Sequence, residues 1–343
     1  MGTVLSKQRG AIMGLAACVV VLFHLKLHTP FELYNYLISR NGNIAVDIFQ
    51  FLSGFGLAFA LQKNSDYYRF MKRRMERILP PYYIALILLL ALYLIQGIFP
   101  IRWFFENFIP LHAWLSGHGR LWYVSGVIVY YALTPLFYFM ILKARYPRTM
   151  LVFLLLCVGL FIPAFSGFAE LDIALMRFSP LVLGIGMGIF QKMHTKPSDR
   201  FLDFLVVAIS FAVGIFIVNH RGEAIDLLLE VITPAQAGRL CKSIIAPLVV
   251  VGLAYMLEGF ERTPLRFLNA AFRQAGRYSL EIYLSHSVIM DALGVLSIEG
   301  WLEASITLLL SHPLAVVLSR VGKRCLPPVM RFLFKANSGV CDC

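Results

Sequence analysis

Residues 9–24 read RGAIMGLAACVVVLFH, residues 43–55 read NIAVDIFQFLSGF, and residues 69–80 read RFMKRRMERILP. The first is an apolar run that ends in His24, the second is an apolar run with Asp47 near its start, and the third is a cluster of basic residues. Apolar runs of this kind predict membrane-spanning helices, whose ionisable side chains tend to face the inside of a helix bundle. Most of the remaining chain is also apolar, so we expect it to surround these three segments.

The composition indicates that most of the chain lies in a bilayer. Of its 343 residues, 59% are hydrophobic and 15% are charged, whereas soluble domains carry about 25% charged residues. A net charge of +12 would suggest nucleic acid in a soluble protein, but in a membrane protein Lys and Arg mark cytoplasmic loops. We therefore expect a multi-pass protein of the cell membrane, with the lipid bilayer and not nucleic acid as its partner.

The six cysteines are scattered along the chain. Their positions show neither the spacing of zinc ligands nor a disulfide framework. No metal site is therefore expected.

Ten segments are long and apolar enough to cross a bilayer, which takes about 17 to 25 residues. They are residues 10–27, 44–62, 79–98, 121–142, 149–165, 173–190, 201–219, 243–258, 278–296 and 302–320. This pattern predicts an all-α integral membrane protein, a bundle of about ten transmembrane helices. It would form a single domain over residues 1–343, with both termini in the cytoplasm and residues 321–343 as a short cytoplasmic tail.

The distribution of basic residues supports this topology. All but eight of the 31 Lys and Arg residues lie in the expected cytoplasmic segments, which are the two termini and residues 63–78, 143–148, 191–200 and 259–277. Gaining or losing one span would reverse the side of every later loop. The bias therefore supports the number of spans as well as the orientation.

His24 and Asp47 are predicted to lie at a similar depth near the external side, where the first span ends and the second begins. A neutral imidazole can take a proton from a reacting hydroxyl, and a neighbouring carboxylate fixes its tautomer and raises its basicity. The two residues are therefore candidates for a general base and its orienting acid. The alternatives are an interfacial histidine bonded to a neighbouring helix and an acid favoured by the helix dipole.

The cluster before Pro80 suggests a phosphate site. Arg73, Arg74 and Arg77 span about one helical turn, so Arg74 and Arg77 share a face. Guanidinium groups bind phosphates through two parallel hydrogen bonds, and a polyphosphorylated donor could dock there from the cytoplasm. Ordinary anchoring beside anionic lipid is the alternative.

Two later segments place polar groups inside the bundle. Trp122 and Tyr123 open the fourth predicted span, and Glu281 and His286 lie within the ninth. A buried acid and a buried histidine on one helix are unusual for packing alone. A proton relay, a substrate pocket or a structural pair between helices would each explain them.

Five segments, in chain order, resemble motifs of the membrane acyltransferase-3 family, whose members are ten-span, acyl-CoA-dependent enzymes that modify surface glycans and related acceptors. They are residues 14–24, 45–55, 73–82, 121–135 and 279–286. The sequence departs from the family pattern at Met13, where the family usually has an arginine. Arg9, one helical turn earlier, is expected to replace it. A milder departure is Gln50, which interrupts a typical phenylalanine pair.

The resemblance implies an O-acetyltransferase that moves an acyl group, expected to be acetyl, from cytoplasmic acyl-CoA to a hydroxyl of a surface or exported carbohydrate. His24 would act as the general base, oriented by Asp47, or would carry a transient acyl group. No permanently bound cofactor is expected, since acetyl-CoA or another acyl-CoA is the donor substrate. The residues expected to bind CoA phosphates are Arg9, Arg73, Arg74 and Arg77, and those expected to bind substrate are Trp122, Tyr123, Glu281 and His286.

A different class of function is also compatible with the buried ionisable residues. A proton-coupled transporter or flippase could use Glu281, His286, His24 and Asp47 as a proton path, although no inverted repeat is visible. A non-catalytic scaffold would leave these residues unexplained. The sequence does not identify the acceptor, the acyl chain length or the oligomeric state.

Overall fold

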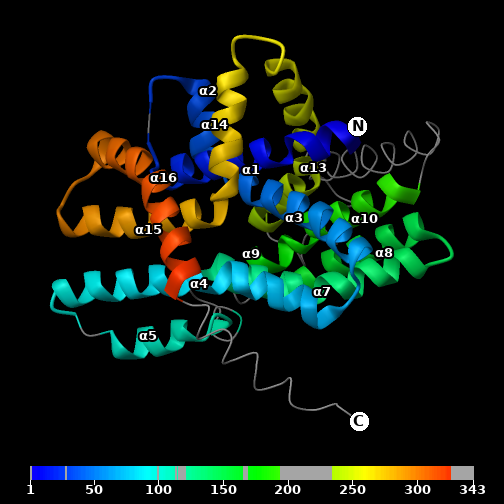
Figure 1. The fold of residues 1–343 in the computed structure, drawn as a ribbon, viewed down its shortest axis with the longest axis horizontal. Coiled ribbons are helices and arrows are strands. Elements are labelled where there is room, and N and C mark those ends of the chain that lie inside the picture. The colour runs from blue at the N-terminus through cyan, green and yellow to red at the C-terminus, as the bar shows by residue number, and fades with distance from the viewer. Residues whose placement is uncertain are drawn as a thin grey trace.

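The structure is a computed structural model that describes residues 2–27, 29–98, 100–112, 114, 121–164, 169–193 and 234–325. All regular elements within these residues are helices, as predicted (Figure 1). In chain order they are α1 (Gly2–His24), α2 (Glu32–Tyr34), the π-helix η1 (Asn35–Arg40), α3 (Ile44–Lys63), α4 (Tyr67–Ile95), α5 (Ile101–Phe108), α7 (Trp122–Lys143), α8 (Pro147–Ala164), α9 (Ala169–Met176), α10 (Phe178–Met193), α13 (Pro234–Phe260), α14 (Arg266–Arg277), α15 (Ser279–Val295) and α16 (Gly300–Cys325).

Six helical segments in the described part of the chain are long and apolar enough to cross a membrane. They are Val4–His24, Ile44–Lys63, Tyr67–Ile95, Trp122–Lys143, Ile173–Met193 and Gly300–Arg324. The chain is therefore a membrane protein by the length and composition of its helices. The predicted span 201–219 and the tail from residue 326 lie outside the described residues, so the count of ten and the cytoplasmic termini stay predictions.

Two segments predicted as cytoplasmic loops contain helices. The basic residues of 63–78 belong to α4, which begins after Asp66 and continues through Pro80 and Pro81 to Ile95. The Asp66 carboxylate caps this helix by accepting a hydrogen bond from the backbone N–H of Arg69 at 2.9 Å. The basic composition of residues 63–78 predicted the side of the bilayer on which this segment lies. Composition of this kind does not define the backbone conformation, because Arg, Lys and Glu are good helix formers.

The second such helix is α14, which lies within the predicted loop 259–277 and crosses α1 at very short range. A Cβ atom added to Gly14 would overlap the carbonyl oxygen of Phe272, and one added to Gly276 would overlap that of Gly10. Helices that meet at small residues can bring their backbones into contact. The glycines therefore dock α14 against the first half of α1, beside each other in Figure 1.

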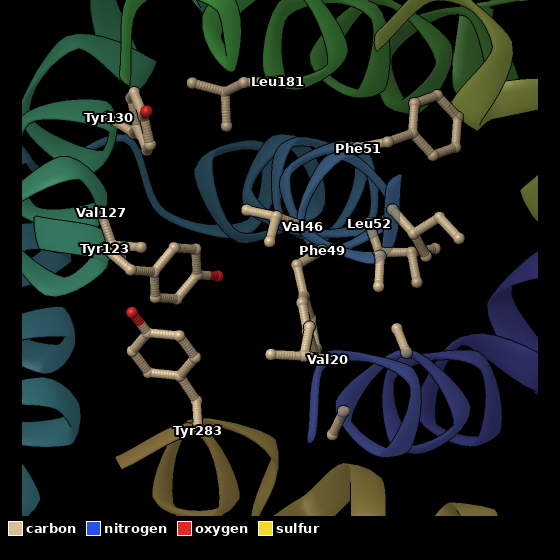
Figure 2. Close-up of a cluster of buried hydrophobic side chains, with 14 of the residues drawn as sticks. Val20, Val46, Phe49, Phe51, Leu52, Tyr123, Val127, Tyr130, Leu181 and Tyr283 are labelled. Carbon is tan, nitrogen blue, oxygen red and sulfur yellow. The ribbon is translucent and has the colours of Figure 1, made fainter. Parts of the chain in front are cut away.

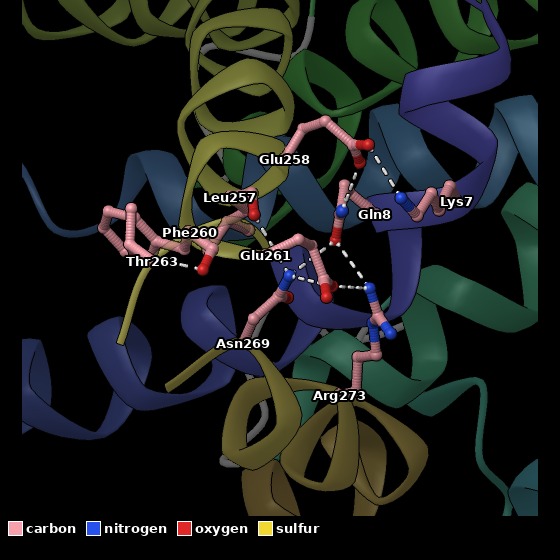
Figure 3. Close-up of polar contacts among 9 residues, drawn as sticks. All are labelled: Lys7, Gln8, Leu257, Glu258, Phe260, Glu261, Thr263, Asn269 and Arg273. Carbon is pink, nitrogen blue, oxygen red and sulfur yellow. Dashed lines mark hydrogen bonds and ion pairs between the residues drawn. The ribbon is translucent and has the colours of Figure 1, made fainter. Parts of the chain in front are cut away.

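A polar network fixes the same end of α1 (Figure 3). Gln8 is fully buried and donates to Glu258 of α13 at 2.7 Å. Its carbonyl oxygen accepts from Asn269 at 3.1 Å and from Arg273 at 3.2 Å, both on α14. Arg273 also forms an ion pair with Glu261. Both polar side-chain atoms of Gln8 have partners on other helices. These contacts fix α1 in an orientation in which the next residue, Arg9, points into the bundle.

Candidate active site

A pocket of about 260 Å³ lies between α1, α3, α4, α7 and α15 and the end of α14. Four arginines contribute to its wall: Arg9, Arg74, Arg77 and Arg277. Most of the remaining wall is apolar or aromatic, and it includes Met13, Phe49, Leu57, Ile78, Tyr123, Val127, Tyr131, Leu280 and Tyr283. The arrangement concentrates positive charge inside an otherwise apolar bundle.

Arg74 presents a guanidinium that no carboxylate of the described residues neutralises. Its Cζ atom lies 5.5 Å from the ring centre of Phe70 and 5.8 Å from that of Tyr131. Aromatic faces attract a cation more weakly than a carboxylate does. Its buried Nε also has no hydrogen-bond partner, so Arg74 can still pair with an anion in the pocket.

Arg9 reaches the pocket across α3. Its Nε donates to the carbonyl of Leu52 at 3.0 Å, and its guanidinium lies where a side chain at residue 56 would be, because residue 56 is a glycine. Met13 lines the same pocket. A positive charge is therefore present in the pocket although residue 13 is uncharged, and it comes from one helical turn earlier on α1.

Arg77 is already paired. It forms an ion pair with Glu281 of α15, to which its Nη2 also donates at 2.9 Å, and the same nitrogen donates to the backbone carbonyl of Arg277 at 3.0 Å. Glu281 is fully buried and is not part of the pocket wall. The geometry therefore gives Glu281 the role of holding Arg77, and the substrate contact expected from the sequence stays a prediction.

Five other predicted site residues also lie outside the pocket wall, namely His24, Asp47, Arg73, Trp122 and His286. Arg73 is exposed, and its Nε donates to the carbonyl of Arg69, one turn back on its own helix, at 3.1 Å. Trp122 packs edge-on against Tyr123, with ring centres 6.0 Å apart. Of these two aromatic residues, Tyr123 lines the pocket and Trp122 does not.

His24 and His286 form a second group of site residues. Their ring centres are 5.0 Å apart, and the Nδ1 atoms lie 2.8 Å and 3.3 Å from the carbonyl oxygens of Val20 and Ile282. A carbonyl can only accept, so both Nδ1 atoms carry the proton in the neutral rings. In each neutral ring, Nε2 is then the nitrogen that carries the lone pair.

Tyr283 connects the two groups. It lines the arginine pocket, and its ring centre lies 5.5 Å from that of His286 and 4.8 Å from that of Tyr123. Figure 2 shows the two tyrosine rings next to each other, Tyr283 from α15 and Tyr123 from α7, near Phe49 of α3. Aromatic rings thus form the boundary between the arginine pocket and the histidine pair.

Asp47 does not contact His24. The carboxylate forms an ion pair with Arg177, in the turn between α9 and α10, and accepts from the Ser243 hydroxyl of α13 at 2.8 Å. Asp47 and Arg177 are both buried. Asp47 therefore joins helices through an ion pair and does not orient His24. The His24 ring is instead oriented by the carbonyl of Val20.

The family model described as an acyltransferase domain matches residues 12–320. The chain belongs to the membrane acyltransferase-3 family. Corresponding searches of curated proteins and of solved structures gave no match. The matched residues include His24, Arg74, Arg77 and His286 but not Arg9, so the place of Arg9 in this acyltransferase rests on the geometry of its pocket.

The structure shows further residues that were not among the predicted site residues: Arg277, Tyr131 and Tyr283 line the pocket, and Arg177 pairs with Asp47. Arg177 carried a usable signal, because a lone cation within an apolar run must find a partner in the bundle. Arg277 lay in a predicted loop with other basic residues, and nothing distinguished it from them. The two tyrosines lie within the motif segments 121–135 and 279–286, but no site role was predicted for them.

Proposed function

We propose that this membrane acyltransferase transfers an acyl group, acetyl in the simplest case, from acyl-CoA to a hydroxyl of a surface or exported carbohydrate. The observation that carries the proposal is the pair of guanidinium groups, Arg9 and Arg74, that face one pocket without a carboxylate partner in the described part of the chain. Unneutralised charge is costly inside a bundle. An anionic ligand would remove that cost, and the pyrophosphate of CoA has suitable charge and hydrogen-bonding geometry.

The length of α1 fits an extended donor. Arg9 and His24 are fifteen residues apart on one helix, which corresponds to about 22 Å along its axis. CoA carries its phosphates at one end and its thioester at the other, with the flexible pantetheine arm between them. A donor held at Arg9 and Arg74 could extend past Tyr283 and place its thioester near His24 and His286.

The proposed reaction uses His24 as base and then as acid. His24 Nε2 takes the proton of the acceptor hydroxyl while that oxygen attacks the thioester carbonyl carbon, and the carbonyl π electrons move to its oxygen. The tetrahedral intermediate collapses with cleavage of the C–S bond. The sulfur leaves as a thiolate and receives the proton from His24, which gives the ester and free CoA.

The charge pattern of the sequence supports the direction of transfer. The basic residues of 63–78 and 259–277 flank the arginine pocket, and such residues favour the cytoplasmic side. Acyl-CoA would therefore enter from the cytoplasm. His24 lies at the far end of α1, where an exported carbohydrate could reach it.

The test replaces His24 with Ala and measures two properties separately. The variant should bind CoA as the wild type does, because His24 is outside the arginine pocket, but it should lose transfer by about 10²-fold or more. Transfer is measured as the mass increase of one acyl group on surface carbohydrate of cells that produce the protein. Retained transfer by a variant present in the membrane at normal amounts would refute the proposed role of His24.

A further inference from the structure

We infer that Arg277 is a specificity-determining residue, which binds the 3′-phosphate of CoA and makes the enzyme prefer CoA thioesters to donors that lack this phosphate. The inference rests on the proposed function, because it assigns one part of the donor to one part of the same pocket. It goes beyond that function because it names the phosphate that is recognised and the residue that binds it.

Arg277 differs from the other pocket arginines in its position. It is the last residue of α14, it lines the pocket, and it is exposed. Among the described residues its side chain makes one long hydrogen bond, to Gln274 at 3.4 Å, and it has no carboxylate partner there. Its backbone carbonyl accepts from Arg77, which leaves the guanidinium itself available on the pocket wall.

The pocket arginines differ in how far they are exposed. Arg277 and Arg77 are exposed, whereas Arg74 and Arg9 are half-buried, and beyond them lie the buried rings of Tyr123 and Tyr283. CoA has a matching order, since the 3′-phosphate lies on the adenosine end, the pyrophosphate comes next, and the pantetheine arm and thioester follow. With the thioester directed inward, the inner pair, the half-buried Arg9 and Arg74, meets the pyrophosphate, and the exposed and unpaired Arg277 meets the 3′-phosphate.

The charges also correspond. Of the four arginines, Arg77 is neutralised by Glu281, so Arg9, Arg74 and Arg277 remain unmatched within the described residues. A phosphate monoester carries about −1.5 to −2 charges near pH 7. Without the 3′-phosphate the pyrophosphate satisfies the inner pair, and Arg277 has no anion to bind.

The experiment measures binding of CoA and of dephospho-CoA to the purified full-length protein in detergent, for the wild type and for Arg277→Gln. The wild type should bind CoA about tenfold more tightly than dephospho-CoA, as expected for one charge-assisted contact near the surface. Arg277→Gln should bind both ligands with the affinity that the wild type has for dephospho-CoA. Arg277→Lys, which keeps the charge but loses the fork of donors, should retain part of the preference.

Arg266→Gln is the matched control. It removes the same charge from an exposed arginine of the same helix, α14, that lies outside the pocket wall, so its preference for CoA should be unchanged. A preference that survives in Arg277→Gln, or that falls equally in Arg266→Gln, would overturn the inference while leaving the proposed function intact. If the wild type binds neither ligand, the proposed function itself fails, and the inference fails with it.

Discussion

At the scale of single residues, the Gln50 side chain lies in an energetically unfavourable environment. It is 1% exposed, and neither its amide nitrogen nor its amide oxygen has a hydrogen-bond partner. A buried polar group without a partner costs about 1–3 kcal/mol. Gln62, twelve residues later on the same helix, differs because its amide donates to the carbonyl of Gly188 at 3.1 Å.

This contrast predicts opposite effects of the same substitution. Gln50→Leu removes an unsatisfied amide and should leave the thermal midpoint unchanged or raise it, whereas Gln62→Leu should lower it because the Gly188 carbonyl loses its donor. Both are measured by thermal unfolding in one detergent. A marked loss of stability in Gln50→Leu would mean that the amide has a partner in the working protein.

Gly56 leads to a second prediction at this scale. A Cβ at residue 56 would overlap the Arg9 guanidinium, which is the far end of a flexible side chain and can move away. Gly56→Ala should therefore weaken CoA binding by about tenfold or less, with little loss of stability. Gly252→Ala is the control, because no atom lies within 4 Å of its added methyl group, and it should leave CoA affinity unaltered. Equal affinities of the two variants would argue against Arg9 as a ligand-binding residue.

At the scale of helices, the buried ion pair of Asp47 and Arg177 joins three elements. It connects the start of α3 to the turn between α9 and α10, and Ser243 extends the contact to α13. Removing one member of a buried pair leaves the other charge without a partner, at a cost of about 3–5 kcal/mol. Removing both can cost much less.

Asp47→Leu should therefore destabilise the protein strongly, whereas Asp47→Leu combined with Arg177→Met should recover most of the loss. The check is a thermal-unfolding series of the wild type, both single variants and the double variant. Additive losses would show that the two side chains act independently. Full inactivity of a well-folded double variant would instead point to a direct part for Asp47 or Arg177 in the reaction.

The sequence predicted helices more accurately than it predicted where they begin and end. The apolar runs at 44–62 and 121–142 correspond closely to α3 and α7. The run at 79–98 was only the apolar half of α4, because hydropathy detects contact with lipid and not the continuity of backbone hydrogen bonds. The arginine cluster therefore lies on the same rigid helix as the membrane span that follows it.

At the scale of the whole molecule, the same limit explains the incorrect partner for Asp47. Hydropathy gives the depth of a residue in the bilayer, and by depth His24 and Asp47 were suitable neighbours. It does not give the rotation of a helix about its axis, which decides that Asp47 faces α10 and α13. Pairs such as Arg77 and Glu281, 204 residues apart, depend on that rotation in two helices at once.

The neighbouring rings of Tyr123 and Tyr283 have an electrical consequence for the proposed reaction. Under the proposed function, the CoA phosphates stay on one side of this boundary and the carbohydrate on the other, and only the pantetheine arm extends past it. In formal terms an acyl cation passes outward while the hydroxyl proton passes inward by way of His24 to the sulfur. The exchange carries no net charge, so the membrane voltage neither drives nor opposes it, and the thioester alone supplies the free energy.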